Sequence, residues 1–336
     1  MSAKLKTAKG HCAIDLFKFI MALMVVAIHT QPFYAFEGSV PAQIFSSLSR
    51  YAVPFFFLAS GYLVGGKLEG RDSSERTVIL RRYALRLLRL YLLWSLIYAP
   101  MALYHYVRDG IPFVKSLLLY VRGLVLLGEH YNSWQLWYLL SLVYGVLLVL
   151  GFERLNIKKS LAGPAVCLIM LISICFDALI HTELFPASGM FAAVRTLVSL
   201  SIANGKILRG LFYFPAGLWL SRRRIHGAKC FMAFLALYAL TWLLPDRLLI
   251  LGDILFVLSD LMLFCFVSGL QLSARPLFSV LRRMSSAVYF IHMWVFSLLC
   301  FYPFRQDDTQ GMAIFLATAA LSLLLSLPYS LKKVNS

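Results

Sequence analysis

The chain has 336 residues, of which 60% are hydrophobic and only 14% carry a charge. This composition is far more apolar than that of an ordinary soluble domain, so the chain is expected to be an all-α polytopic membrane protein. The net charge of +17 does not indicate a nucleic-acid partner, because the basic residues cluster between apolar runs. The six cysteines are scattered singly with no CxxC pair, and we expect neither a disulfide nor a metal site.

The first predicted helix, residues 14–30, carries Asp15 and Lys18 near its start and His29 near its end. At 100° per residue, Lys18 and His29 share one face and are separated by roughly 16 Å along the axis. Ionisable groups are costly inside a bilayer, so this shared face indicates a functional interior surface. The alternative is that Lys18 extends to the lipid headgroups and His29 sits at the opposite interface.

A second span is predicted at 46–66, followed by the densest basic stretch of the chain. The excess of Lys and Arg in cytoplasmic loops places this stretch in the cytoplasm. A third span follows at about 90–105. The basic residues 81–89 are predicted to form the first turns of the same helix.

The next two apolar segments, 112–128 and 134–152, could each cross the membrane, or only the second could. If both cross the membrane, later basic loops fall outside the cell, against the positive-inside rule. We therefore expect 112–128 to be re-entrant or interfacial. The remaining spans are then predicted near 134–152, 162–180, 207–220, 229–244, 248–270, 285–302 and 311–331. The result is one domain over 1–336, with about ten transmembrane helices and both termini cytoplasmic.

Several ionisable residues lie at the ends of these spans. Arg50, at the external start of the second span, could face one site with His29, or simply anchor the helix at the interface. Arg82, Arg86 and Arg89 are spaced to line one helix face at the cytoplasmic boundary. Guanidinium groups bind phosphates through paired donors, although ordinary flanking positive charge would also explain them.

The order of five sequence blocks resembles the acyltransferase-3 family of membrane proteins. The blocks are Lys18 to His29, VPFFFLASGY at 53–62, Arg86-Leu-Leu-Arg89, LWYLL at 136–140 and SSAVYFIHMWVF at 285–296. The resemblance covers about residues 12–300, and it implies a multi-pass protein of the bacterial cytoplasmic (inner) membrane. Such proteins move an acyl group, commonly acetyl, from cytoplasmic acyl-CoA to a hydroxyl of an extracytoplasmic acceptor. The implied partners are membrane lipid and a small-molecule or cell-envelope glycan acceptor.

The resemblance also implies roles for single residues. The histidine matching His29 is regarded as catalytic in the family, and the arginines matching Arg86 and Arg89 as donor-handling; many members have Arg where this chain has Lys18. As a general base, His29 would take the acceptor's proton, while Arg50 or Lys18 would stabilise the oxyanion. Further expected contacts are Arg82 with the donor, and Asp15, Trp137, Tyr138 and His292 with the substrate. A structural hydrogen bond between helices is the alternative for His292.

A second function comes from another class of protein. The segments VVAIHTQPF and AVPFFFLASGYLVG also resemble the membrane module of the serine racemases of vancomycin resistance, which is thought to import L-serine. In a serine carrier, Lys18, His29 and Arg50 would bind the amino acid or couple its transport to protons. A cytoplasmic racemase domain is then an expected partner if the chain is a fragment. The donor-binding arginines discriminate, because only the enzyme needs them.

Overall fold

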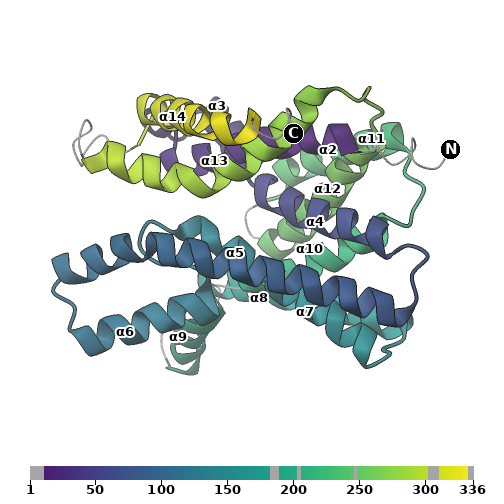
Figure 1. The fold of residues 1–336 in the computed structure, drawn as a ribbon, viewed down its shortest axis with the longest axis horizontal. Coiled ribbons are helices and arrows are strands. Elements are labelled where there is room, and N and C mark those ends of the chain that lie inside the picture. Colours follow the sequence, from purple (N-terminus) through teal and green to yellow (C-terminus); the bar gives the residue numbers. More distant parts are fainter. Residues whose placement is uncertain (1–10, 182–188, 203–205, 246–247, 302–309, 332–336) are drawn as a thin grey trace. The chain divides into compact units, whose positions relative to one another are not determined.

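The computed structural model describes residues 11–181, 189–202, 206–245, 248–301 and 310–331. Within these ranges all regular elements are helices (Figure 1). Among the helical segments of these described ranges, eight are long and apolar enough to cross a membrane. The expected fold class, an all-α polytopic membrane protein, is confirmed.

The described helices are α2 (His11–Thr30), η1 (Tyr34–Phe36), α3 (Val40–Ser49), α4 (Ala52–Leu68), α5 (Ser73–Arg108), α6 (Phe113–Arg122), η2 (Gly123–Leu127), η3 (Trp134–Leu136), α7 (Trp137–Arg154), α8 (Lys159–His181), α9 (Gly189–Ile202), α10 (Lys206–Leu220), α11 (Gly227–Leu243), α12 (Leu249–Gly269), α13 (Pro276–Phe301) and α14 (Met312–Leu331).

The eight long segments coincide with eight of the ten predicted spans. They are Cys12–Thr30, Val40–Leu68, Ser73–Arg108, Trp134–Arg154, Ser160–Ala178, Leu249–Gly269, Pro276–Phe301 and Met312–Leu331. The other two predicted spans correspond to α10 and α11, which have 15 and 17 residues. About 20 apolar residues usually cross a bilayer, so these two crossings stay predictions. The same holds for the re-entrant or interfacial assignment of 112–128, where the structure has α6 and η2.

The second predicted span begins differently from the prediction. Helix α4 starts at Ala52, and the residues before it form the separate short helix α3. Pro54 explains where α4 begins, because proline lacks an amide N–H and is tolerated in the first turn of a helix but not in its interior. Arg50 consequently caps the C-terminus of α3 and does not belong to α4.

Helix α5 confirms that the basic stretch and the third span form one continuous helix. Asp72 caps its N-terminus, and the carboxylate accepts a hydrogen bond from the Glu75 amide at 2.8 Å. At 36 residues the helix is about 54 Å long, well over the roughly 30 Å of a hydrocarbon core. Part of it must therefore extend beyond the apolar layer.

The chain divides into two compact units. Unit 1 comprises Met1–Phe56, Ile225–Ala233 and Met262–Ser336, and unit 2 comprises Phe57–Arg224 and Phe234–Leu261. In unit 1, α2, α13 and α14 pack together around Val26, Val288 and Ala319. Because contacts between α2 and α13 advance along both helices in the same direction, the two are parallel. Helix α14 runs antiparallel to them.

In unit 2, α7 packs against both α5 and α10. Glycine allows the backbones of α7 and α10 to approach closely, since a Cβ on Gly210 would lie 2.4 Å from the carbonyl oxygen of Ser141. The Ser141 hydroxyl donates to the Ile207 carbonyl at 2.8 Å and accepts from the Gly210 amide at 2.9 Å. Small residues at such a contact are typical of helix packing in membranes.

Candidate functional site

Two histidines meet inside unit 1. His29, on the last turn of α2, lies beside His292 of α13, with ring centroids 5.4 Å apart and ring planes inclined by 30°. His29 is half-buried, whereas His292 is completely buried. Next to His29, the carbonyl of Thr30 accepts a hydrogen bond from the amide of Gly311 at 2.9 Å. The pair therefore lies at the end of the three-helix packing where α2 finishes and α14 begins.

A charged cluster lies toward the other end of α2. Asp15 is buried and forms an ion pair with Arg282 of α13 at 3.7 Å. Lys18 is close enough to interact electrostatically with both of them. Since Lys18 and His29 are roughly 16 Å apart along the helix, unit 1 holds two separate polar centres on one pair of helices.

Arg50, the third residue expected to act with His29, lies exposed after α3, which packs on α2. Its expected role, contacting the developing oxyanion, stays a prediction.

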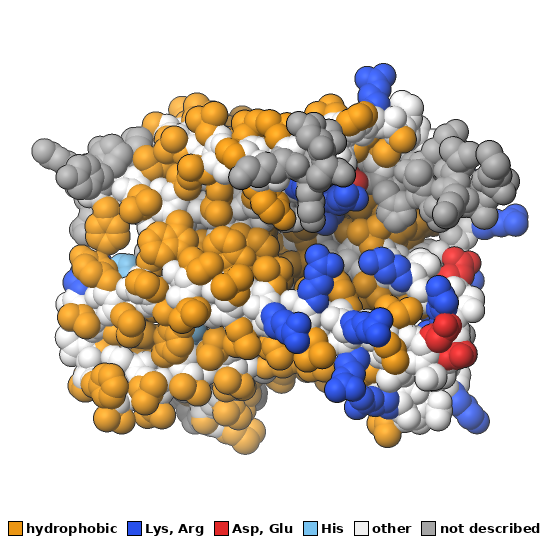
Figure 2. Space-filling model, in the orientation of Figure 1, with side chains coloured by type: hydrophobic (Ala, Val, Ile, Leu, Met, Phe, Trp, Pro, Cys, Tyr) orange, Lys and Arg blue, Asp and Glu red, His pale blue; other side chains and the backbone are white. Residues whose placement is uncertain are grey.

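In unit 2, the predicted arginine face of α5 is exposed. Arg82, Arg86 and Arg89 point away from the buried side of the helix, which includes Leu80 and Leu87. Figure 2 shows Lys and Arg side chains gathered over the N-terminal half of α5 and hydrophobic side chains farther along it. Within the described residues these three arginines have no carboxylate partner, unlike Arg76, which pairs with Glu153. They therefore present exposed guanidinium groups on the surface of unit 2.

Beside this face, aromatic and hydroxyl side chains connect α4, α5 and α7. The Tyr138 hydroxyl lies 3.1 Å from the Ser60 hydroxyl, and the Tyr83 hydroxyl also interacts with Ser60. Phe57 packs against the rings of Trp137 and Tyr138, with centroids 6.0 and 4.6 Å away. Tyr138 is buried and Trp137 half-buried. The structure thus brings these two predicted substrate contacts together with Ser60, a residue that the sequence did not single out as a ligand.

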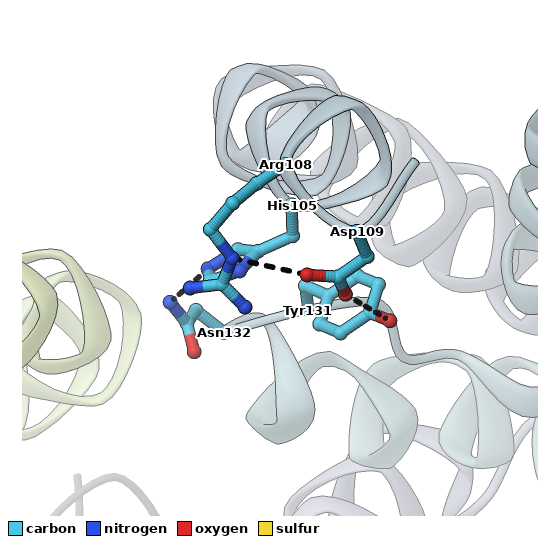
Figure 3. A network of polar contacts seen from close by, with 5 residues as sticks. All are labelled: His105, Arg108, Asp109, Tyr131 and Asn132. Atoms are coloured by element: carbon cyan, nitrogen blue, oxygen red, sulfur yellow. Dashed lines mark hydrogen bonds and ion pairs between the residues drawn. The ribbon is translucent and has the colours of Figure 1, made fainter. Parts of the chain in front are cut away.

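A polar network at the C-terminal end of α5 was missed by sequence reasoning (Figure 3). Asp109 accepts a hydrogen bond from Arg108 Nε at 3.0 Å and another from the Tyr131 hydroxyl at 3.0 Å. These bonds, the one from Arg108 first, hold the pKa of the Asp109 carboxyl below its usual value. The Asn132 amide lies 3.1 Å from His105 Nε2. Two segments some 25 residues apart meet here, and no local sequence pattern predicts such a contact.

Close in sequence to this network, His130 stacks face to face on Tyr120 of α6, with centroids 4.2 Å apart and an interplanar angle of 8°. Burial, assisted by the nearby Arg122, lowers the pKa of His130 to about 4. Gly123 makes room for this ring, since a Cβ there would lie 2.3 Å from an imidazole carbon. The neutral, packed imidazole holds the 128–133 loop against α6. Within the described residues, no three His, Cys, Asp or Glu side chains gather as a metal site.

Comparison with known proteins gives one family and several partial relatives. A family model described as an acyltransferase domain matches residues 13–331. An amino-acid racemase of Enterococcus faecalis is 33% identical over 136 residues, covering 40% of this chain and 18% of the racemase. A serine/alanine racemase of Enterococcus gallinarum is 35% identical over 136 residues, covering 40% and 19%. The chain thus spans less than a fifth of the length of these relatives. No solved structure matches the chain.

Proposed function

The chain belongs to the acyltransferase-3 family of membrane proteins, and from that membership we propose that it is an integral membrane O-acyltransferase. It takes an acyl group, acetyl being the expected one, from cytoplasmic acyl-CoA and transfers it to a hydroxyl of an extracytoplasmic acceptor. The single observation that carries the proposal is the family match, which extends over nearly the whole chain. The proposal includes a location in a bacterial cytoplasmic membrane, with membrane lipid and a cell-envelope glycan or small molecule as partners.

The arginine face of α5 supports the donor part of the proposal. CoA carries several phosphates, and guanidinium groups bind phosphate through strong charge-assisted hydrogen bonds. Arg82, Arg86 and Arg89 are exposed and have no carboxylate partner within the described residues. An arginine already paired, such as Arg76 with Glu153, would have to break that ion pair first. We assign these three exposed arginines to donor binding.

The histidine of α2 supports the chemical step. Transfer to an alcohol needs a base near the hydroxyl, and neutral imidazole is suited to this near neutral pH. His29 takes the hydroxyl proton while the hydroxyl oxygen bonds to the acyl carbon. The thioester C–S bond then breaks, and the thiolate receives a proton. Arg50 is the candidate for stabilising the oxyanion beside His29, because Lys18, expected for the same role, lies roughly 16 Å from His29 along α2. Asp15, Trp137, Tyr138 and His292 are the candidates for contacting the substrate.

A second function, L-serine transport, is favoured by one specific observation. Asp15, Lys18 and Arg282 place charges of both signs close together inside unit 1. An amino acid carries a carboxylate and an ammonium, so this cluster has the chemistry to bind one. The partial likeness to racemases of enterococci supports the same alternative, in which a racemase domain would use the serine that is delivered.

Purified protein reconstituted in liposomes discriminates the two functions. We expect turnover of acetyl-CoA that depends on a hydroxyl acceptor, measured as release of free CoA thiol. Uptake of labelled L-serine is measured on the same liposomes. Serine uptake without acyl-CoA turnover would reject the enzyme and establish the carrier.

A further inference from the structure

His292 has one nitrogen engaged and the other available. Its Nδ1 lies 3.1 Å from the carbonyl oxygen of Val288, one turn earlier on α13. A carbonyl can only accept, so Nδ1 must carry the proton in this bond. In the neutral ring Nε2 then bears the lone pair. This Nε2 is buried without a hydrogen-bond partner, and it belongs to a side chain with no exposed surface.

The ring of His29 packs beside the ring of His292. Two imidazoles joined by an N–H···N hydrogen bond have centroids roughly 5 Å apart, given ordinary donor–acceptor distances. The observed separation is 5.4 Å with an inclination of 30°. The separation therefore matches such a bond, which requires the half-buried His29 ring to turn one of its N–H groups toward His292 Nε2. The completely buried His292 ring has less freedom to move.

Two buried hydroxyls of α14 could compete as donors for this nitrogen. The contact between Arg283 Nε and the Ser330 carbonyl, at 2.8 Å, sets the register of the antiparallel α13 and α14. Counting nine residues from each puts His292 level with Leu321, next to Ser322, and Thr318 lies about one turn farther along α14. Both hydroxyls are buried without a hydrogen-bond partner. A bond from Ser322 to Nε2 would make His292 purely structural, so the test includes this serine.

We propose that His292 is a positioning residue for His29. Its Nε2 accepts a hydrogen bond from one N–H of His29, which fixes the tautomer so that the other His29 nitrogen presents its lone pair to the acceptor. When that nitrogen takes the hydroxyl proton, the same bond stabilises the imidazolium; the proton later passes to the thiolate. His292 keeps its own Nδ1 proton throughout. The arrangement follows the general pattern of a base oriented by a third group.

Two near-isosteric substitutions separate this role from a structural one. The side-chain amide of His292→Asn can still donate to the Val288 carbonyl, but it has no atom at the position of Nε2. In His292→Gln an amide oxygen can accept a hydrogen bond near that position. The inference rests on the proposed acyl transfer, so the unmutated protein is assayed in parallel.

We expect His292→Asn to lower kcat about 10- to 10³-fold with little change in KM for acetyl-CoA. His292→Gln should recover a substantial part of the loss, and Ser322→Ala should leave kcat unchanged. Full activity of His292→Asn, or the reverse order of the two variants, would overturn the positioning role while the proposed function stands. No acyl transfer by the unmutated protein would overturn both.

Folding is checked by size-exclusion elution and thermal midpoint in detergent. If His292→Asn does not fold, His292→Ala is assayed with added imidazole. Restoration of kcat by imidazole without a change in thermal midpoint supports the role. Its failure in a folded variant contradicts the role, as does equal loss of stability and activity in every variant at this position.

Discussion

Asp15 and Arg282 form an ion pair across α2 and α13, with a nitrogen–oxygen distance of 3.7 Å. The Asp15 side chain is only 8% exposed, whereas that of Arg282 is 51% exposed. The two partners are unequal, because removing the exposed arginine takes a cation away from a carboxylate that stays buried. An exposed pair of the same length would contribute little to stability.

From this relationship we expect Arg282→Gln to destabilise the protein. The double variant Asp15→Asn, Arg282→Gln should lose less stability than the sum of the losses in the two single variants. The coupling free energy should be on the order of 1 kcal/mol, since half-exposure of the arginine weakens the interaction. Thermal midpoints of the four proteins in detergent give the measurement. The exposed pair of Arg71 with Glu75 is the matched control, and strict additivity at Asp15 and Arg282 would contradict the argument.

The arginine face of α5 is tested by single substitutions. Arg86→Ala or Arg89→Ala should weaken CoA binding at least tenfold, because each charge-assisted contact is worth about 1.5–3 kcal/mol. Lysine keeps the charge but not the paired donors, so the CoA affinity of Arg86→Lys should lie between those of Arg86→Ala and the unmutated protein. Binding of CoA to purified protein is the measurement, and Arg81→Ala, which alters an exposed arginine off this face, is the control. Unchanged affinity in both alanine variants would move the donor site elsewhere and revive the transport function.

The buried His130 predicts a pH dependence of stability. Its pKa is lowered to about 4 in the fold, against 6.5 when unperturbed. The stabilising contribution of the neutral ring is thus fully present above pH 6.5 and is lost as the pH falls through 4. The loss amounts to roughly 3 kcal/mol at the acid end. Thermal midpoints measured from pH 7.5 to 4.5 should fall less steeply in His130→Gln than in the unmutated protein, and an identical slope would contradict the assignment.

The predicted topology is tested by cysteine labelling. The distribution of basic residues places Lys158 and Arg223 in the cytoplasm, with 112–128 not crossing the membrane. In a background whose six native cysteines are replaced, a cysteine at either position should react with an impermeant maleimide only after the membrane is opened. A cysteine in a predicted external loop, at Tyr34, serves as the positive control. Labelling of 158 or 223 in intact cells would reject the topology.

How much of the fold and of the candidate site could be predicted from the sequence depends on how far apart in the chain the interacting residues lie. The continuity of α5 through its arginines was predictable, because helix pattern and N-cap are local. The exposed face of Arg82, Arg86 and Arg89 was predictable for the same reason. The break before α4 was missed, although Pro54 carries the signal. Helices of marginal length, such as α10, remain undecided by sequence pattern and by length alone.

Contacts between segments far apart in the sequence could not be predicted in this way. His29 and His292 were each singled out, but nothing local indicates that residues more than 250 positions apart stack against each other. Arg282 was not singled out at all, since a basic residue at a helix start is ordinary in a membrane protein. Its role can be recognised only from its ion pair with the buried Asp15. The packing of α2 on α13 therefore supplies both pairs that matter in unit 1.

The last prediction is that acyl transfer depends on His29. A general base contributes about 10²- to 10⁴-fold to the rate, and His29→Gln should remove that contribution while the protein still folds and binds CoA. His226, which lies in a loop outside the proposed machinery, offers the control substitution His226→Gln. Release of CoA thiol in liposomes with a hydroxyl acceptor measures turnover, and labelled serine uptake is followed on the same samples. Full acyl transfer by His29→Gln would end the catalytic role. Should the protein be a carrier, the same variant would lose proton-coupled accumulation of serine but keep slow downhill exchange, an outcome that acyl transfer chemistry does not produce.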